Sequence, residues 1–106
     1  MARFKSKRSN ACDIPASVKA KVAERDGSRC LICGRIGQSH CHYIPRSQGG
    51  LGIEQNVVTL CPDCHRDFDN GYHHNEIKVI LADYLRSQYP GWDERELVFD
   101  KWKEIK

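Results

Sequence analysis

A helical spacing of apolar residues follows the polar N-terminal segment of the chain. Ile14, Val18 and Val22 recur every four positions, which predicts an amphipathic helix that enters at Pro15 and stops at Gly27. The basic residues of this stretch are expected to point away from the apolar face into solvent: Lys19, Lys21 and Arg25.

A second helix is predicted over Asn75–Gln88, because apolar residues again recur at helical spacing. Its inward face is expected to consist of Ile77, Ile80, Leu81, Tyr84 and Leu85. Pro90 and Gly91 end this helix. Asp93 is predicted to cap a last short element, helix or strand, that carries Leu97, Val98 and Trp102.

The segment between these helices, from Cys30 to about Asn70, is dense in Cys, His, Gly and Pro, which predicts turns and short strands that close into a short helix. A chain of 106 residues and 12.2 kDa suits one domain. We therefore expect a flexible basic arm over residues 1–12 and a single domain over residues 13–106. Its core spans about residues 28–70, and a helical extension spans residues 75–106.

The net charge of +3 is unevenly distributed. Residues 1–35 hold nine basic against three acidic residues, whereas the two later thirds of the chain are mildly acidic. A basic N-terminal third suits a polyanionic partner such as nucleic acid, although a merely solvated tail gives the same pattern. The apolar run Val79–Ala82 is too short to cross a membrane, and the first ten residues lack the apolar core of a secretory signal. These features predict a cytoplasmic, reducing compartment.

Four of the six cysteines form two C-x-x-C pairs, Cys30/Cys33 and Cys61/Cys64, which are separated by 27 residues. This pattern is typical of a structural Zn²⁺ site with tetrahedral thiolate ligands. Disulfides would require an oxidising compartment, and a redox role would need a separate explanation for each pair. Cys12 lies outside both pairs and is expected to be a free thiol.

The segment between the two pairs carries the sequence H-x-x-P-R-S-x-G-G from His42, followed by N-x-x-x-L-C-x-x-C-H from Asn56. This order resembles the HNH endonuclease family over about Val22 to Asp69, and it is most similar to small phage-type members with paired zinc knuckles. The resemblance implies an α+β fold, the ββα-metal (His-Me) finger, with flanking helices. It also implies hydrolysis of DNA that leaves 5′-phosphate and 3′-hydroxyl ends.

Phosphodiester hydrolysis needs a base that activates water and a cation that neutralises charge. A neutral imidazole can serve as the base at physiological pH, and the resemblance assigns this role to His42. It implies that Asn56 holds the histidine strand through backbone hydrogen bonds and that His65 binds the catalytic divalent metal (Mg²⁺, Mn²⁺, Ni²⁺ or Zn²⁺). Asp69, four residues after His65, would share its helix face and bind the same ion, or it is a solvated carboxylate.

Cys41 departs from the family pattern, because the residue before the general base is usually an Asp or His metal ligand. A thiolate suits zinc better than magnesium, so Cys41 is expected to assist metal binding or to impair catalysis. Two alternatives to a nuclease follow: a nucleic-acid-binding module with an impaired site, or a zinc finger that binds a protein through Trp102. The basic residues expected to contact DNA are Lys5, Lys7, Arg8, Lys19 and Arg46. Phage DNA-processing or packaging proteins are further predicted partners.

Overall fold

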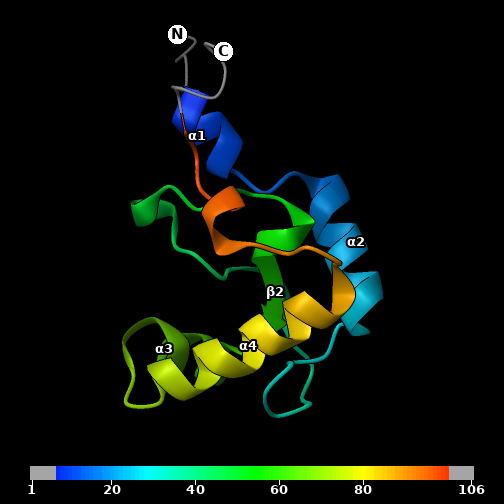
Figure 1. The fold of residues 1–106 in the computed structure, drawn as a ribbon. Coiled ribbons are helices and arrows are strands. Elements are labelled where there is room, and N and C mark those ends of the chain that lie inside the picture. The colour runs from blue at the N-terminus through cyan, green and yellow to red at the C-terminus, as the bar shows by residue number, and fades with distance from the viewer. Residues whose placement is uncertain (1–6, 101–106) are drawn as a thin grey trace, which may run out of the picture.

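A two-stranded antiparallel hairpin followed by a helix forms the centre of the molecule (Figure 1). In the computed structural model, which describes residues 7–100, β1 (Gln38–His42) pairs with β2 (Val57–Leu60), and α3 (Pro62–Asn70) follows β2 after one residue. His42 pairs with Val57 at the end of β1, and every residue of β2 is buried. The predicted α+β class and the ββα order are therefore confirmed.

The two predicted helices flank this unit. Helix α2 (Ala16–Asp26) packs against both strands, and α4 (His74–Gln88) packs against α3. Pro15 stands at the N-cap of α2, and Gly27 ends the helix with a φ of 66°, a conformation that glycine adopts without steric cost. The predicted bounds of both helices are confirmed to within one residue.

Two side chains lie on different faces from those expected. The side chain of Ile80 is exposed, so the inward face of α4 is formed by Ile77, Leu81 and Leu85 with Tyr84 beside them. Arg25 was expected in solvent, yet its side chain is only 11% exposed. Ile80 lies at the border of its apolar stripe, where helical spacing alone does not decide burial. Arg25 lies seven residues after Val18, on the same face as the apolar stripe, and only its charge led to the expectation of a solvent-exposed side chain.

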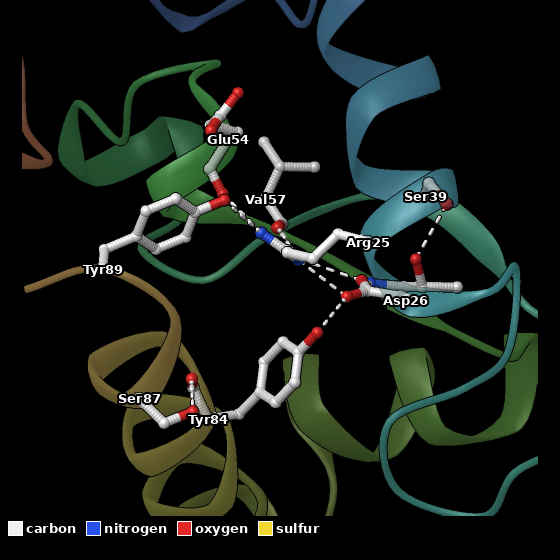
Figure 2. A network of polar contacts seen from close by, with 9 residues as sticks. Arg25, Asp26, Ser39, Glu54, Val57, Tyr84, Ser87 and Tyr89 are labelled. Atoms are coloured by element: carbon white, nitrogen blue, oxygen red, sulfur yellow. Dashed lines mark hydrogen bonds and ion pairs between the residues drawn. The ribbon is translucent and has the colours of Figure 1, made fainter.

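Arg25 and Asp26 form the centre of a buried polar network between α2, β2 and α4 (Figure 2). The Arg25 guanidinium donates both to the Asp26 carboxylate and to the backbone oxygens of Glu54 and Val57, each at 2.8 Å. The Tyr84 hydroxyl donates to Asp26 at 2.6 Å. Burial lowers the pKa of Arg25, but its hydrogen bonds with Asp26 and Tyr89 outweigh burial and raise that pKa overall. The network therefore keeps Arg25 charged.

The N-terminal segment differs from the predicted flexible arm, because Lys7–Cys12 form a short helix, α1. Cys12 is buried at the end of α1, and the backbone amide of Gly52 donates to the Ala11 carbonyl oxygen at 2.9 Å. These tertiary contacts, absent from any local pattern, hold the segment against the loop between the strands. The predicted DNA contact at Lys5 and the predicted docking residue Trp102 lie outside the described residues.

Over residues 89–100, the described part of the predicted helical extension beyond α4, the chain is mostly not helical. Helix α4 ends at Gln88, and one 3₁₀ turn follows at Glu94–Glu96. The Asp93 side chain accepts a hydrogen bond from the backbone amide of Arg95, so the predicted cap is confirmed. Val98 then forms a β-bridge with Gly50. The residues after the 3₁₀ turn therefore lie beside the loop that follows His42, held by this isolated bridge.

Among residues 7–100, no helix has both the length and the apolar character needed to span a lipid bilayer.

We predict that Arg25→Ala lowers the free energy of unfolding by about 3–5 kcal/mol, because it leaves the fully buried Asp26 carboxylate without its cation. Urea denaturation measures this change. Arg86→Ala is the matched control, since its ion pair with Asp83 is exposed and contributes less than about 1 kcal/mol. Equal losses in the two variants would contradict a structural role for the buried pair.

Candidate metal centre and histidine site

The four cysteines of the two C-x-x-C pairs converge on one point. Their sulfur atoms all lie within 4.8 Å of one another, and Sγ of Cys33 is 3.6 Å from Sγ of Cys61. Zn–S bonds of about 2.3 Å in a tetrahedron separate sulfur atoms by about 3.8 Å, whereas a disulfide bond is far shorter. The donor set and its spacing therefore fit a structural zinc ion.

Each pair lies on a turn that local sequence favours. Gly34 follows the first pair with a φ of 78°, and its amide donates to the Cys30 carbonyl oxygen. Cys61 is the N-cap of α3, where its sulfur accepts from the Cys64 amide. Burial raises the pKa of the Cys30 thiol, but backbone amides of Cys33 and Cys61 outweigh it and lower that pKa overall. Among the four cysteines the thiolate is therefore favoured at Cys30, whereas burial and the neighbouring cysteine sulfurs raise the pKa of Cys64.

His42 lies at the end of β1 with its ring half-buried. Its Nε2 atom is 2.7 Å from the carbonyl oxygen of Cys12, which ends α1. Because a carbonyl oxygen can only accept, Nε2 carries a proton, and the neutral ring has its lone pair on Nδ1. Burial lowers the pKa of His42, although the Cys12 carbonyl opposes this effect. The imidazole is therefore held neutral with one basic nitrogen.

Asn56 is fully buried and connects the two sides of the loop that joins the strands. Its side-chain oxygen accepts from the Ile44 amide at 2.8 Å, and its side-chain nitrogen donates to the carbonyl oxygens of Ile44 and Leu51. The Tyr43 amide also donates to the Asn56 carbonyl oxygen. These bonds hold the residues that follow His42 against the start of β2.

His65 and Asp69 share one face of α3, as their four-residue spacing predicts. Nε2 of His65 lies 3.3 Å from Oδ2 of Asp69, so both atoms can contact one ion at ligand distances of about 2.1 Å. The His40 ring lies 5.9 Å from the His65 ring, and burial together with His65 lowers the pKa of His40. Within residues 7–100, only the cysteine cluster brings three or more such ligand atoms within 4.8 Å.

Cys41 is buried in the hydrophobic core, where its sulfur faces away from solvent. Burial, with smaller contributions from Asp69 and Cys30, raises the pKa of the Cys41 thiol well above its usual value. The side chain is therefore a neutral thiol. The predicted ligand set of Cys41, His65 and Asp69 remains a prediction, with two of its three members adjacent.

Three of the basic residues predicted to bind DNA lie in or beside the segment that contacts His42. Arg8 donates to the carbonyl oxygens of Arg46 and Ser47 at 3.2 and 3.0 Å, and Arg46 pairs with Asp13 at 2.6 Å. Arg8 and Arg46 line a pocket of about 200 Å³ together with Ser9 and Cys12. Lys7 and Lys19 are exposed.

Sequence patterns gave no indication of the Cys12 carbonyl beside His42, and only a slight one of His40 beside His65. The Cys12 carbonyl contacts His42 through the backbone, so no side-chain motif could have indicated it. His40 lies beside His65, although only its position in the strand two residues before His42 hinted at a shared surface. No role was predicted for His73 and His74, which were expected at the surface. His73 is exposed and contacts the Asp67 carboxylate at 2.9 Å, whereas His74 is half-buried and stacks on Phe68.

Comparison with known proteins adds an independent observation. The family model described as HNH endonuclease matches residues 29–71. The chain is 34% identical to anaredoxin of Nostoc sp. strain PCC 7120 over 63 residues, which cover 58% of this chain and 78% of that protein. It is also 30% identical over 74 residues to the type IV methyl-directed restriction enzyme EcoKMcrA of Escherichia coli K12, covering 60% of this chain and 27% of that enzyme.

We predict that purified protein holds about one tightly bound zinc ion per chain. Cys61→Ser removes one ligand, so this variant should lose the zinc and unfold at a lower temperature. Cys12→Ala is the matched control, because Cys12 is also buried but lies outside the cluster. Metal analysis and thermal unfolding measure both effects. Zinc-free protein with disulfides between the pairs would contradict the metal centre.

Proposed function

Because the chain belongs to the HNH endonuclease family, we propose that it is a metal-dependent nuclease that hydrolyses DNA phosphodiester bonds with His42 as general base. The observation that carries this proposal is the half-buried imidazole of His42, whose Nε2 atom is hydrogen-bonded to the Cys12 carbonyl oxygen. Its Nδ1 lone pair remains available for the proton of a water molecule.

The proposed reaction begins when Nδ1 of His42 accepts a proton from water. The water oxygen then attacks phosphorus opposite the 3′ oxygen, and the bond from phosphorus to that oxygen breaks. The released 3′ oxygen takes a proton from solvent, and His42 returns its own proton to solvent, so the products carry 5′-phosphate and 3′-hydroxyl ends. Asn56 contributes by holding the backbone after His42, and it need not touch the substrate. The lowered pKa of His42 keeps the base unprotonated at neutral pH.

His65 and Asp69 are proposed to hold the catalytic divalent ion, since their donor atoms are adjacent on one helix face. Such an ion, when bound, would neutralise charge on the phosphate and on the leaving oxygen. His40 lies beside this pair, which makes it a better candidate for a further ligand than the buried, neutral thiol of Cys41. The four-cysteine centre is proposed to act structurally, because its four sulfurs would fill every position of a tetrahedral ion and leave none for a substrate.

DNA binding is proposed for the basic residues beside the site. Arg8 and Arg46 flank the segment that contacts His42, while Lys7 and Lys19 extend the positive charge onto α1 and α2. Contacts of this kind go to phosphates, so binding should be salt-sensitive and weakly sequence-specific.

A second function is supported by one observation. Cys41 occupies the position of the usual metal-binding carboxylate or imidazole, and its thiol is held neutral in the core. A chain with this substitution could bind nucleic acid through its zinc-supported fold without cutting it. Cleavage assays distinguish the two functions directly.

We predict that the protein nicks supercoiled plasmid in the presence of Mg²⁺, Mn²⁺, Ni²⁺ or Zn²⁺, and that His42→Ala reduces the rate at least about 100-fold because the general base is lost. His73→Ala is the matched control, since this exposed histidine pairs with Asp67 on α3. The absence of nicking with every metal would favour the binding module. Equal rates for His42→Ala and wild type would exclude His42 as the base.

We predict that Lys19→Ala weakens DNA binding and reduces the slope of log affinity against log salt by about 1, because one phosphate contact is lost. Fluorescence anisotropy with duplex DNA at several salt concentrations measures the slope. Arg86→Ala, which removes an exposed positive charge from α4, should leave it unchanged. Equal slopes for Lys19→Ala and wild type would remove Lys19 from the DNA interface.

A further inference from the structure

The backbone carbonyl of Cys12 lies 2.7 Å from Nε2 of His42, although Cys12 is 30 positions earlier in the sequence and belongs to a different segment from β1. A histidine whose Nε2–H donates to this carbonyl has one defined tautomer and one defined ring orientation. Without the carbonyl, the ring could rotate about its side-chain bonds and place the proton on either nitrogen. The position of Cys12 therefore matters for any reaction that uses the Nδ1 lone pair.

Three independent contacts hold the segment around Cys12 against the loop that follows His42. Arg8, four residues before Cys12, donates to the carbonyl oxygens of Arg46 and Ser47. Asp13, directly after Cys12, accepts from Arg46 at 2.6 Å. The Cys12 carbonyl is thus held from both sides by groups that contact the same loop.

Gly52 provides the third contact through close backbone approach. Its amide donates to the Ala11 carbonyl oxygen at 2.9 Å. A Cβ atom at this position would lie 1.9 Å from the carbonyl oxygen of Asp13, which is far inside van der Waals contact. Any larger residue would therefore push Asp13, and with it Cys12, away from the loop.

We propose that residues 8–13 form a latch that positions His42, with Arg8, Asp13 and Gly52 as positioning residues that act through the Cys12 carbonyl. The latch sets the Nε2–H tautomer and directs Nδ1 toward the water. This inference rests on the proposed function only in its kinetic consequence, because the tautomer of His42 is a property of the free protein. The N-terminal helix is accordingly part of the active site as well as a carrier of positive charge.

Two variants test the latch without removing a group that touches substrate. Gly52→Ala displaces the Asp13 carbonyl by steric overlap and leaves the net charge unchanged. Asp13→Ala removes the ion pair with Arg46 and makes the surface more positive. Asp83→Ala is the matched control for Asp13→Ala, because Asp83 forms an exposed ion pair with Arg86 on α4.

The first measurement is the ring ¹⁵N spectrum of histidine-labelled, zinc-loaded protein, with the His42 signals assigned by their absence in His42→Gln. The wild type and Asp83→Ala should show the Nε2–H tautomer alone. Gly52→Ala and Asp13→Ala should show an average of the two tautomers. An unchanged His42 spectrum in both variants would overturn the latch. If Gly52→Ala does not fold, Asp13→Ala decides the result, since its half-exposed side chain tolerates truncation.

The second measurement is plasmid nicking at saturating DNA. Loss of the ring orientation should lower kcat roughly 10- to 100-fold in both variants. A purely electrostatic role for Asp13 predicts the opposite, because its removal would strengthen DNA binding and lower KM with kcat unchanged. That outcome, or a changed tautomer with unchanged kcat, would overturn the latch. A wild type that never nicks DNA would refute the proposed function, whereas the ring spectrum would still decide the latch.

Discussion

The buried carboxylate of Asp26 is the constraint on which the arrangement of the elements depends. A charge that is fully removed from water must have its hydrogen bonds satisfied, and Asp26 accepts them from Arg25, from the Tyr84 hydroxyl and from the Thr59 amide. These donors come from α2, α4 and β2, so one side chain sets how the two long helices lie on the strand that precedes α3 (Figure 2). Displacement of any of these elements would leave a polar group unpaired in the core.

The candidate site is assembled from segments that local structure alone does not hold together. His42 lies at the end of β1, and His65 lies near the start of α3, which follows β2. The Cys12 carbonyl belongs to the N-terminal helix α1. The four cysteines bring together the two ends of the segment between the C-x-x-C pairs. Asn56 is hydrogen-bonded to Ile44 and Leu51 inside the loop that joins the strands.

How much was predictable from the sequence depended on whether a feature is local. The bounds of α2 follow from Pro15 and Gly27, and the cysteine cluster follows from two spacings of two residues, because short-range geometry determines both. Ile80 was misplaced because a residue at the border of an apolar stripe is buried or exposed according to its tertiary partners. Arg25 was misplaced because its charge favoured solvent, although its helix position faces inward and its tertiary partners Asp26 and Tyr89 satisfy that charge. The flexible arm was expected for the same reason, since a six-residue polar helix gains its stability from packing rather than from its own sequence.

The amino-acid sequence by itself determined the α+β class, the four-thiol cluster and the order of His42, Asn56 and His65, since residue types and spacings specify each of them. Tertiary structure decided which tautomer His42 adopts and how its pKa shifts, because both depend on burial and on a backbone carbonyl 30 residues away. It also decided that Cys41 is buried in the core. Burial and long-range hydrogen bonds arise only when the chain has closed, and for that reason no linear pattern contains them.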